Sequence, residues 1–347
     1  MAAKKKQKPL KQVLRREIII TVLLTLVFAF YLLRVPVSAG VTLLSFLCFI
    51  VAVFPYIALG NPVVPKKLER MIKPSFYWTA AGSIWAVAAV YALFSGQAGL
   101  WNLAFLAVYI ALPFVIHLSS KGSEHALRIT DVLLLFLLWL PVEFDFVPAL
   151  SLPPAQGFVS LTMIVALLIA LLIFYVDRRL GVGYDFRLKN RDWTFALFYF
   201  MLFFVIAVVI GGRTGFIEMT DRIPSARDVL IHLFGIAFFI ALPEEILFRG
   251  IIYTLIASRL KNRRYNVLWA LIISSVIFGL AHGNNPQGPF LDINLGSLGI
   301  WQMPWVYVLL ATIAGFFYGW VFIRTRKVTA AALMHLMVDW AWFVFFD

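Results

Sequence analysis

The sequence predicts an all-α integral membrane protein. Hydrophobic residues make up 62% of its 347 residues and charged residues 14%, whereas a soluble domain is typically about 45–50% apolar and about 25% charged. Apolar runs of about 17–25 residues recur along the chain, and a helix of that length crosses the roughly 30 Å hydrocarbon core. The runs are continuous and not alternating, which favours helices over a closed barrel.

Eleven apolar segments are expected to form a polytopic bundle of membrane helices. In chain order they cover residues 18–33, 41–59, 76–94, 100–118, 130–147, 158–176, 193–211, 229–257, 266–282, 305–323 and 329–346. Charged and proline residues leave the fifth segment an uninterrupted apolar part only from Val132 to Leu140. So short a stretch is typical of a half-helix or a re-entrant piece, in which case ten spans remain.

The placement of lysine and arginine predicts the orientation, because cytoplasmic loops carry an excess of both. With the N-terminus in the cytoplasm, 25 of the 30 basic residues lie on the cytoplasmic side, and the exceptions are Arg34, Arg213, Arg222, Arg227 and Arg249. We therefore expect a cytoplasmic N-terminus. The net charge of +13 then describes a basic face beside anionic lipid, and we expect no nucleic-acid partner.

Polarity divides the chain into four expected parts. Residues 1–17 form a basic cytoplasmic tail, residues 18–176 form membrane helices of unknown role, and residues 177–192 form a cytoplasmic connector. Residues 193–347 carry ionisable side chains at membrane depth. Such side chains cost at least about 2.5–3.5 kcal/mol at the bilayer centre, so they normally face a protein interior or a wet cavity and serve a function there. We expect this last part to hold the functional site.

The first candidate motif lies near the middle of the eighth segment. Glu244 and Glu245 stand side by side there, preceded by Pro243 and followed by Arg249. Residues four apart share a helix face, so Glu245 and Arg249 can pair while Glu244 turns about 100° away. Proline removes a backbone donor and bends a helix, which helps to open a cavity. Glu244 is then the carboxylate left free for chemistry.

Two further motifs follow in later segments. Phe278 and His282 are four apart near the end of the ninth segment, and His335 and Asp339 are four apart in the last. Neither motif is specific alone. A histidine at a membrane edge is usually interfacial, and a histidine–aspartate pair at this spacing is as often a structural hydrogen bond as a catalytic one.

In this order and spacing, the three motifs resemble the CPBP intramembrane protease family, which includes type II CAAX prenyl endopeptidases and bacterial relatives linked to bacteriocin processing and immunity. The family pattern is two glutamates with arginine four after the second, then phenylalanine with histidine four later, then histidine with asparagine or aspartate four later. The resemblance covers roughly residues 192–347. Two positions differ: eukaryotic prenyl proteases usually have asparagine where this chain has Asp339, and some have asparagine where it has Pro286.

The resemblance implies an intramembrane endopeptidase that hydrolyses a peptide bond of a membrane-associated or lipidated protein by activated water. Glu244 is then the general base, His282 orients the water, and His335 with Asp339 positions or stabilises the tetrahedral oxyanion. Glu245, Arg249 and Phe278 have supporting roles. The substrate, prenylated or not, is the expected partner, and the cavity is expected among the eighth, ninth and last helices.

The residues do not decide between a metal-dependent and a metal-free mechanism. Glu244, His282 and His335 are candidate ligands of a catalytic zinc ion, since two histidines and a glutamate form a three-ligand site. A metal-free glutamate mechanism is equally compatible and is preferred here. The sequence lacks the HExxH motif of helical zinc proteases.

Two other functions and one geometric difficulty also stay open. One alternative is a proton-coupled transporter, because intramembrane acids serve as proton relays in such proteins. The other is a catalytically inactive member of the same family that acts as a membrane scaffold. At about 1.5 Å per residue, the predicted spans put Glu244, His282 and His335 at different depths, so straight upright helices do not bring them together. We expect a multi-pass protein of a bacterial plasma membrane, with an organelle membrane as the alternative location.

Overall fold

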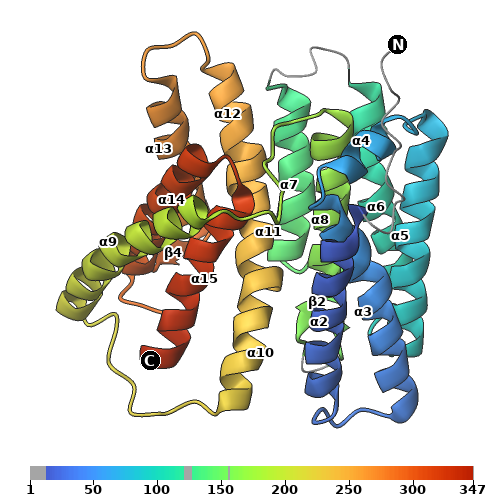
Figure 1. Cartoon of the computed structure of the whole chain (residues 1–347), viewed down its shortest axis with the longest axis horizontal. Helices are drawn as coiled ribbons and strands as arrows, with labels where there is room; N and C mark the ends of the chain where they lie inside the picture. Colours follow the sequence, from blue (N-terminus) through green and yellow to red (C-terminus); the bar gives the residue numbers. More distant parts are fainter. Residues whose placement is uncertain (1–12, 121–126, 155–156, 347) are drawn as a thin grey trace, which may run out of the picture. The chain divides into compact units, whose positions relative to one another are not determined.

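The computed structural model describes residues 13–120, 127–154 and 157–346, and in these residues the chain is mainly helical, with few strands (Figure 1). The strands are short antiparallel pairs, β1 (Ser151–Leu152) with β2 (Val159–Ser160) and β3 (Leu291–Asn294) with β4 (Ile300–Met303). The all-α prediction is confirmed. Most of the predicted tail, residues 1–17, lies outside the described residues.

The described residues form two compact units, of which the first comprises residues 13–120, 128–154 and 157–179 and the second residues 127 and 180–346. The helices of the first unit are α2 (Arg15–Leu32), α3 (Ala39–Leu59), α4 (Val63–Glu69), α5 (Pro74–Phe94), α6 (Leu100–Ser119), α7 (Ile129–Glu143) and α8 (Leu161–Ala170), which continues as the π-helix η1 (Leu171–Asp177). Asp177 ends this run and accepts hydrogen bonds from Tyr77 and His117, each at 2.5 Å. These bonds fix the end of η1 against α5 and α6.

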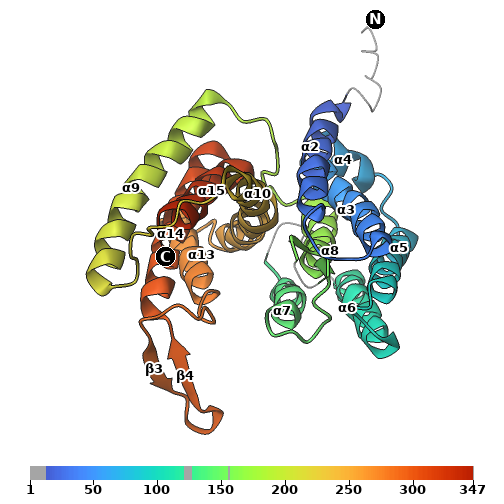
Figure 2. The ribbon, with the colours of Figure 1, turned by 90° about the horizontal axis from the view of Figure 1, so that it is seen from below.

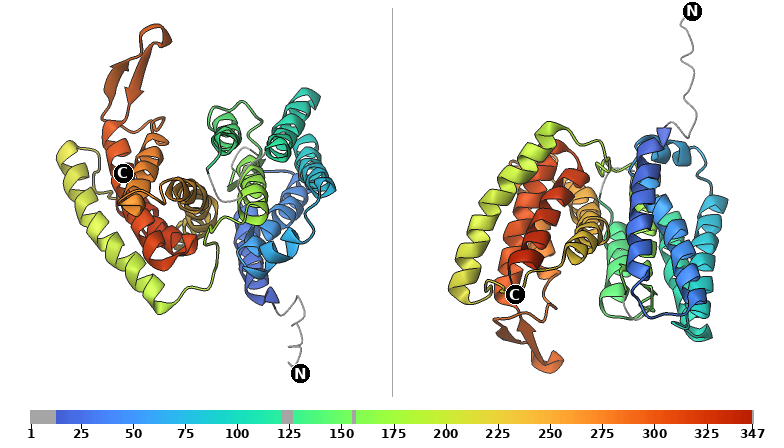
Figure 3. Two further views of the ribbon diagram at one scale, coloured as in Figure 1. Left: turned by 90° about the horizontal axis from the view of Figure 1, so that it is seen from above. Right: turned by 60° about the horizontal axis from the view of Figure 1, so that its bottom comes forward.

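The helices of the second unit are α9 (Asn190–Thr214), α10 (Ala226–Ile236), α11 (Leu242–Glu245), α12 (Thr254–Arg259), α13 (Asn266–Leu280), α14 (Trp305–Thr325) and α15 (Val328–Phe345), with a single 3₁₀ turn, η4 (Gly296–Leu298), between β3 and β4. Figure 2 shows α9 lying along α14 and α15. The β3–β4 hairpin lies between α13 and α14 in the sequence and projects from the helices of this unit (Figure 3).

Helices α10, α11 and α12 are parts of one helical rod, Ala226–Arg259, that runs for 34 residues. Two π-helical turns, η2 (Ala237–Ala241) and η3 (Ile246–Tyr253), flank α11. Pro243 has no N–H to donate, and before it Leu242 donates its N–H to Ala237 O, five residues back. The sequence predicted a bend at Pro243. The structure has π-helical turns on both sides of this proline, and such turns are frequent at functional sites.

Among the described residues, seven helices are long and apolar enough to cross a membrane: Ala39–Leu59, Pro74–Phe94, Leu100–Ser119, Asn190–Thr214, Ala226–Arg259, Trp305–Thr325 and Val328–Phe345. The other four predicted segments coincide with α2, α7, α8–η1 and α13. Of these, α7 and α13 have 15 residues each, and α2 begins with Arg15, Arg16 and Glu17. The count of eleven spans and the cytoplasmic N-terminus therefore stay predictions.

Helices α13 and α14 approach closely because small residues lie at their contact. A Cβ atom built on Gly279 would overlap the Thr312 hydroxyl and would lie 2.7 Å from Val308 O. On α14, Gly315 and Gly319 are four apart, in the GxxxG spacing that lets membrane helices come together. This contact sets the position of Phe278 and His282 relative to α14.

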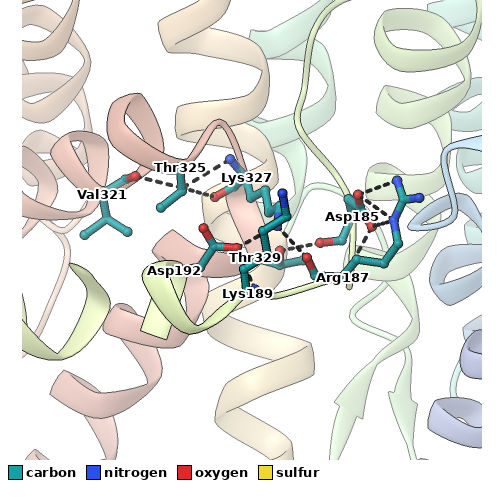
Figure 4. A network of polar contacts seen from close by, with 8 residues as sticks. All are labelled: Asp185, Arg187, Lys189, Asp192, Val321, Thr325, Lys327 and Thr329. Carbon is teal, nitrogen blue, oxygen red and sulfur yellow. Dashed lines mark hydrogen bonds and ion pairs between the residues drawn. The ribbon is translucent and has the colours of Figure 1, made fainter. Parts of the chain in front are cut away.

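The start of α15 is held by a polar network with the segment before α9 (Figure 4). Lys327 Nζ donates to Asp192 Oδ2 at 2.6 Å and to Arg187 O at 2.5 Å. Thr329 Oγ1 donates to Asp185 O at 2.6 Å, and Val328 N–H donates to Gly183 O at 3.1 Å. Because α15 carries His335, this network fixes the helix that brings the last motif to the site.

Candidate active site

Glu245 and Arg249 form a buried ion pair at the base of the site. Glu245 is 0% exposed and Arg249 is 1% exposed, and 2.9 Å separates Arg249 Nη1 from Glu245 Oε1. Arg249 Nη2 also donates to Gly315 O at 2.9 Å, and the guanidinium lies over the ring of Phe278 at 4.3 Å. Buried charges need such partners, and the pair has the four-residue spacing that the sequence indicated.

His335, on α15, forms a hydrogen bond with the glutamate of this ion pair. Its Nδ1 lies 3.0 Å from Glu245 Oε1, and because a carboxylate oxygen accepts, the Nδ1–H is the donor. Its Nε2 lies 3.3 Å from Asp339 Oδ2. The imidazole stacks on the ring of Tyr318, with 4.5 Å between centroids and 15° between planes. His335 is therefore held on both nitrogens and on one face.

Glu244 points away from the buried pair, as the helix geometry predicted. Its side chain is 25% exposed, yet Oε2 is buried and has no hydrogen-bond partner among the described residues. His335 Nε2 lies 3.9 Å away, which is too far for a hydrogen bond. A buried carboxylate oxygen of this kind needs an explanation, and its position in a cavity leaves it able to bind a water or a substrate group.

His282 follows the last turn of α13, and its hydrogen bond indicates which ring nitrogen carries the proton. Its Nδ1 lies 2.8 Å from Phe278 O, and a carbonyl oxygen only accepts, so Nδ1 carries the proton. In the neutral ring, Nε2 is then an acceptor. The ring packs on Phe278 at 4.7 Å and on Tyr307 at 5.5 Å. Phe278 thus both orients His282 and covers Arg249.

Glu244, His282, His335 and Asp339 all line one cavity of about 540 Å³. The depth mismatch expected for straight, upright helices is therefore absent. The rod that carries Glu244 is not a regular α-helix, and α13 reaches the cavity with its C-terminal end. The remaining walls are largely apolar and include Phe203, Phe216, Ile240 and Trp342.

The cavity also involves helices that the sequence analysis did not assign to it. Phe203 and Phe204 come from α9, and Tyr307 and Tyr318 come from α14. Nothing in the pattern of α9 distinguishes its aromatic residues from lipid-facing ones. In α14, the GxxxG spacing of Gly315 and Gly319 is a signal of close packing that was available in the sequence.

The proposed zinc ligands do not form a metal site in this geometry. Among the described residues, no group of three or more histidine, cysteine, aspartate or glutamate side chains is placed to hold a metal ion. Both ring nitrogens of His335 face carboxylate oxygens, so the set of Glu244, His282 and His335 does not fit a shared ion. No step of the reaction below is assigned to a metal.

Comparison with known families gives one match. Residues 226–341 match the family described as Type II CAAX prenyl endopeptidase Rce1-like. The matched segment is about a third of the chain and contains all three motifs. No curated protein and no solved structure matched the chain. Residues 226–341 are thus similar to a family of membrane-embedded proteases, and with its long apolar helices the chain is an integral membrane protein.

Proposed function

We propose that the protein is an intramembrane endopeptidase that hydrolyses a peptide bond of a membrane-associated protein or peptide with a water activated by Glu244. Residues 193–347 are its catalytic part. One observation carries the proposal: the unpartnered Oε2 of Glu244 lies in the same cavity as the imidazole of His282, whose Nε2 is left as an acceptor.

The reaction begins with a water between Glu244 and His282. Glu244 accepts one proton from the water as its oxygen attacks the carbonyl carbon of the substrate. The new C–O bond forms while the C=O π electrons move to the carbonyl oxygen. Glu244 then returns the proton to the leaving nitrogen as the C–N bond breaks, which leaves a carboxylic acid and an amine. General acid–base catalysis of this kind contributes about 10²–10⁴-fold.

Glu245, Arg249 and His335 hold the site in register. Arg249 neutralises Glu245, which in turn fixes the proton of His335 on Nδ1. Asp339 engages the other ring nitrogen at 3.3 Å. His335 and Asp339 thereby line the cavity beside Glu244, with His335 Nε2 3.9 Å from Glu244 Oε2, and we expect them to position the carbonyl on which the tetrahedral oxygen forms.

The test is hydrolysis of a mixed library of prenylated and unmodified peptides by detergent-purified protein, read by mass spectrometry. Wild type is compared with Glu244→Gln and His282→Ala, and each is assayed with and without a chelator. We expect cleavage by wild type alone, unaffected by the chelator. The matched control is Glu218→Gln, which changes an exposed glutamate of the same unit and is expected to cleave as wild type does.

Three results would contradict the proposal in different ways. Equal cleavage by wild type and both variants would remove the assigned site. Cleavage that a chelator stops and zinc restores would replace the metal-free step. Ion-coupled flux through reconstituted liposomes, with no cleavage of any peptide, would favour a transporter.

A further inference from the structure

The motif residues that line the cavity offer many hydrogen-bond acceptors and few donors. Glu244 and Asp339 only accept as carboxylates. The Nδ1–H of His282 is already donated to Phe278 O. In His335, Nδ1–H is donated to Glu245 and Nε2 lies against Asp339. A tetrahedral oxyanion is stabilised by donors aimed at it, so a donor from outside the motifs would add to what His335 and Asp339 provide.

Tyr307 places a phenol donor beside these motif residues. It lies in the first turn of α14, is half-buried and lines the cavity. Its ring stacks on His282 with 5.5 Å between centroids and 28° between planes. On another side it meets Phe216 edge-on at 5.7 Å. Two rings from separate elements therefore hold the ring of Tyr307 in place.

The hydroxyl of Tyr307 is free to serve a ligand. No acceptor within the described part of the chain is bound to it, and the charges of Asp339 and Glu244 act on it electrostatically. Tyr318 also lines the cavity, but it is only 1% exposed and is packed against His335 and Arg249. Of the two phenols, Tyr307 is the one that a substrate can contact.

We propose that Tyr307 is a further catalytic residue, whose hydroxyl donates a hydrogen bond to the carbonyl oxygen of the scissile peptide as negative charge develops on that oxygen. This role rests on the proposed endopeptidase function. Tyr307 keeps its own proton throughout, because the proton of the attacking water goes to Glu244. The phenol is a neutral donor near pH 7, since an ordinary tyrosine ionises only near pH 10.

The decisive variant is Tyr307→Phe, which keeps the stack on His282 and removes only the hydroxyl. It is compared with wild type, Glu244→Gln and the control Tyr253→Phe, which removes the same oxygen from a buried tyrosine outside the cavity lining. The substrate is the peptide that wild type cleaves best. We expect kcat of Tyr307→Phe to fall by about 10²-fold, as for loss of one oxyanion donor, with KM changed less than about twofold.

The pH profile separates this role from one of merely positioning His282. Loss of an oxyanion donor lowers kcat equally at each pH, whereas a displaced His282 shifts the profile along the pH axis. The inference is overturned if Tyr307→Phe cleaves as fast as Tyr253→Phe, if only KM changes, or if the profile shifts. In each of these results, cleavage by wild type and its loss in Glu244→Gln would leave the endopeptidase function intact. Failure of wild type to cleave would remove both.

Discussion

His335 donates a hydrogen bond to Glu245 across the second unit, with 3.0 Å between His335 Nδ1 and Glu245 Oε1, although the two residues are 90 positions apart in the sequence. Glu245 also pairs with Arg249 at 2.9 Å. One buried carboxylate therefore connects the first motif to the third, and its neighbour Glu244 is left facing the cavity. Adjacent glutamates thus have different surroundings and different expected roles.

Replacing Glu244 is expected to abolish cleavage without loss of stability. The carboxylate has an unpartnered, buried Oε2, and a neutral amide costs less to bury than a charge. Glu244→Gln should therefore unfold in detergent at or above the wild-type temperature. The control is the exposed Glu218→Gln, which should alter neither property. A clearly lower unfolding temperature for Glu244→Gln would contradict this.

Arg249→Met is expected to destabilise the protein strongly. The substitution leaves Glu245, which is fully buried, without its cationic partner, and breaking a buried ion pair from one side costs about 3–5 kcal/mol. Thermal unfolding in detergent measures the effect. Arg263→Met, at an exposed position between α12 and α13, is the matched control. Equal unfolding temperatures for the two variants would show that Arg249 is not needed to compensate Glu245.

Asp339→Asn is expected to reduce the dependence on Tyr307. An asparagine side chain still offers His335 an acceptor and adds an N–H donor, so it can take part in stabilising the oxyanion. In a double-mutant cycle with Tyr307→Phe, the loss in kcat should be at least about tenfold smaller in the Asp339→Asn background, because neighbouring residues in one network do not act additively. Independent, multiplicative losses would argue against a shared role.

Gly279→Ala is expected to separate α13 from α14. The added Cβ would meet the Thr312 hydroxyl and would lie 2.7 Å from the backbone oxygen of Val308, which cannot move aside. Overpacking of this kind costs about 1–3 kcal/mol, and it should also lower activity because α13 carries His282. Gly82→Ala, where a Cβ meets nothing within 4 Å, is the control. Similar stabilities for the two variants would refute the close contact.

The network at the start of α15 is expected to weaken in acid. Burial raises the pKa of Asp185. The hydrogen bonds from Arg187 and the positive charge of Arg187 lower it by more, so the pKa of Asp185 lies below the ordinary value of an aspartate. A lowered pKa contributes stability that is present above the unfolded pKa of about 3.9 and is lost as pH falls through the folded value. The stability difference between wild type and Asp185→Asn should therefore shrink as pH falls below about 4.

Thermal unfolding from pH 7 downwards measures this difference. Asp292→Asn, on the exposed strand β3, serves as the control for general effects of acid on the protein. A difference between wild type and Asp185→Asn that stays constant across the range would contradict the expected pH dependence.

Local relationships in the site were predictable from the sequence. Helix periodicity alone puts Glu245 and Arg249 on one face and turns Glu244 away, and both features are present. The same periodicity pairs His335 with Asp339, which lie 3.3 Å apart. These predictions needed only the assumption of helices, and apolar runs in lipid must be helical because their backbone groups have no water to bind.

Contacts between distant elements were not predictable in this way. The cavity walls from α9, the stack of Tyr307 on His282 and the π-helical turns around Pro243 each depend on how several helices pack at once. No spacing in the sequence encodes the bond between Glu245 and His335. The estimate from straight helices even placed the three motifs at different depths.

The sequence by itself thus determined that the chain is a helical membrane protein, which side chains at membrane depth are ionisable, and which neighbours within one helix pair. The tertiary structure decided that these side chains meet in one cavity, that Oε2 of Glu244 has no hydrogen-bond partner among the described residues, and that Tyr307 places a phenol beside the motif residues. The physical reason is range: hydrophobicity and helix periodicity act within a segment, whereas hydrogen-bond satisfaction in a cavity depends on every helix that lines it.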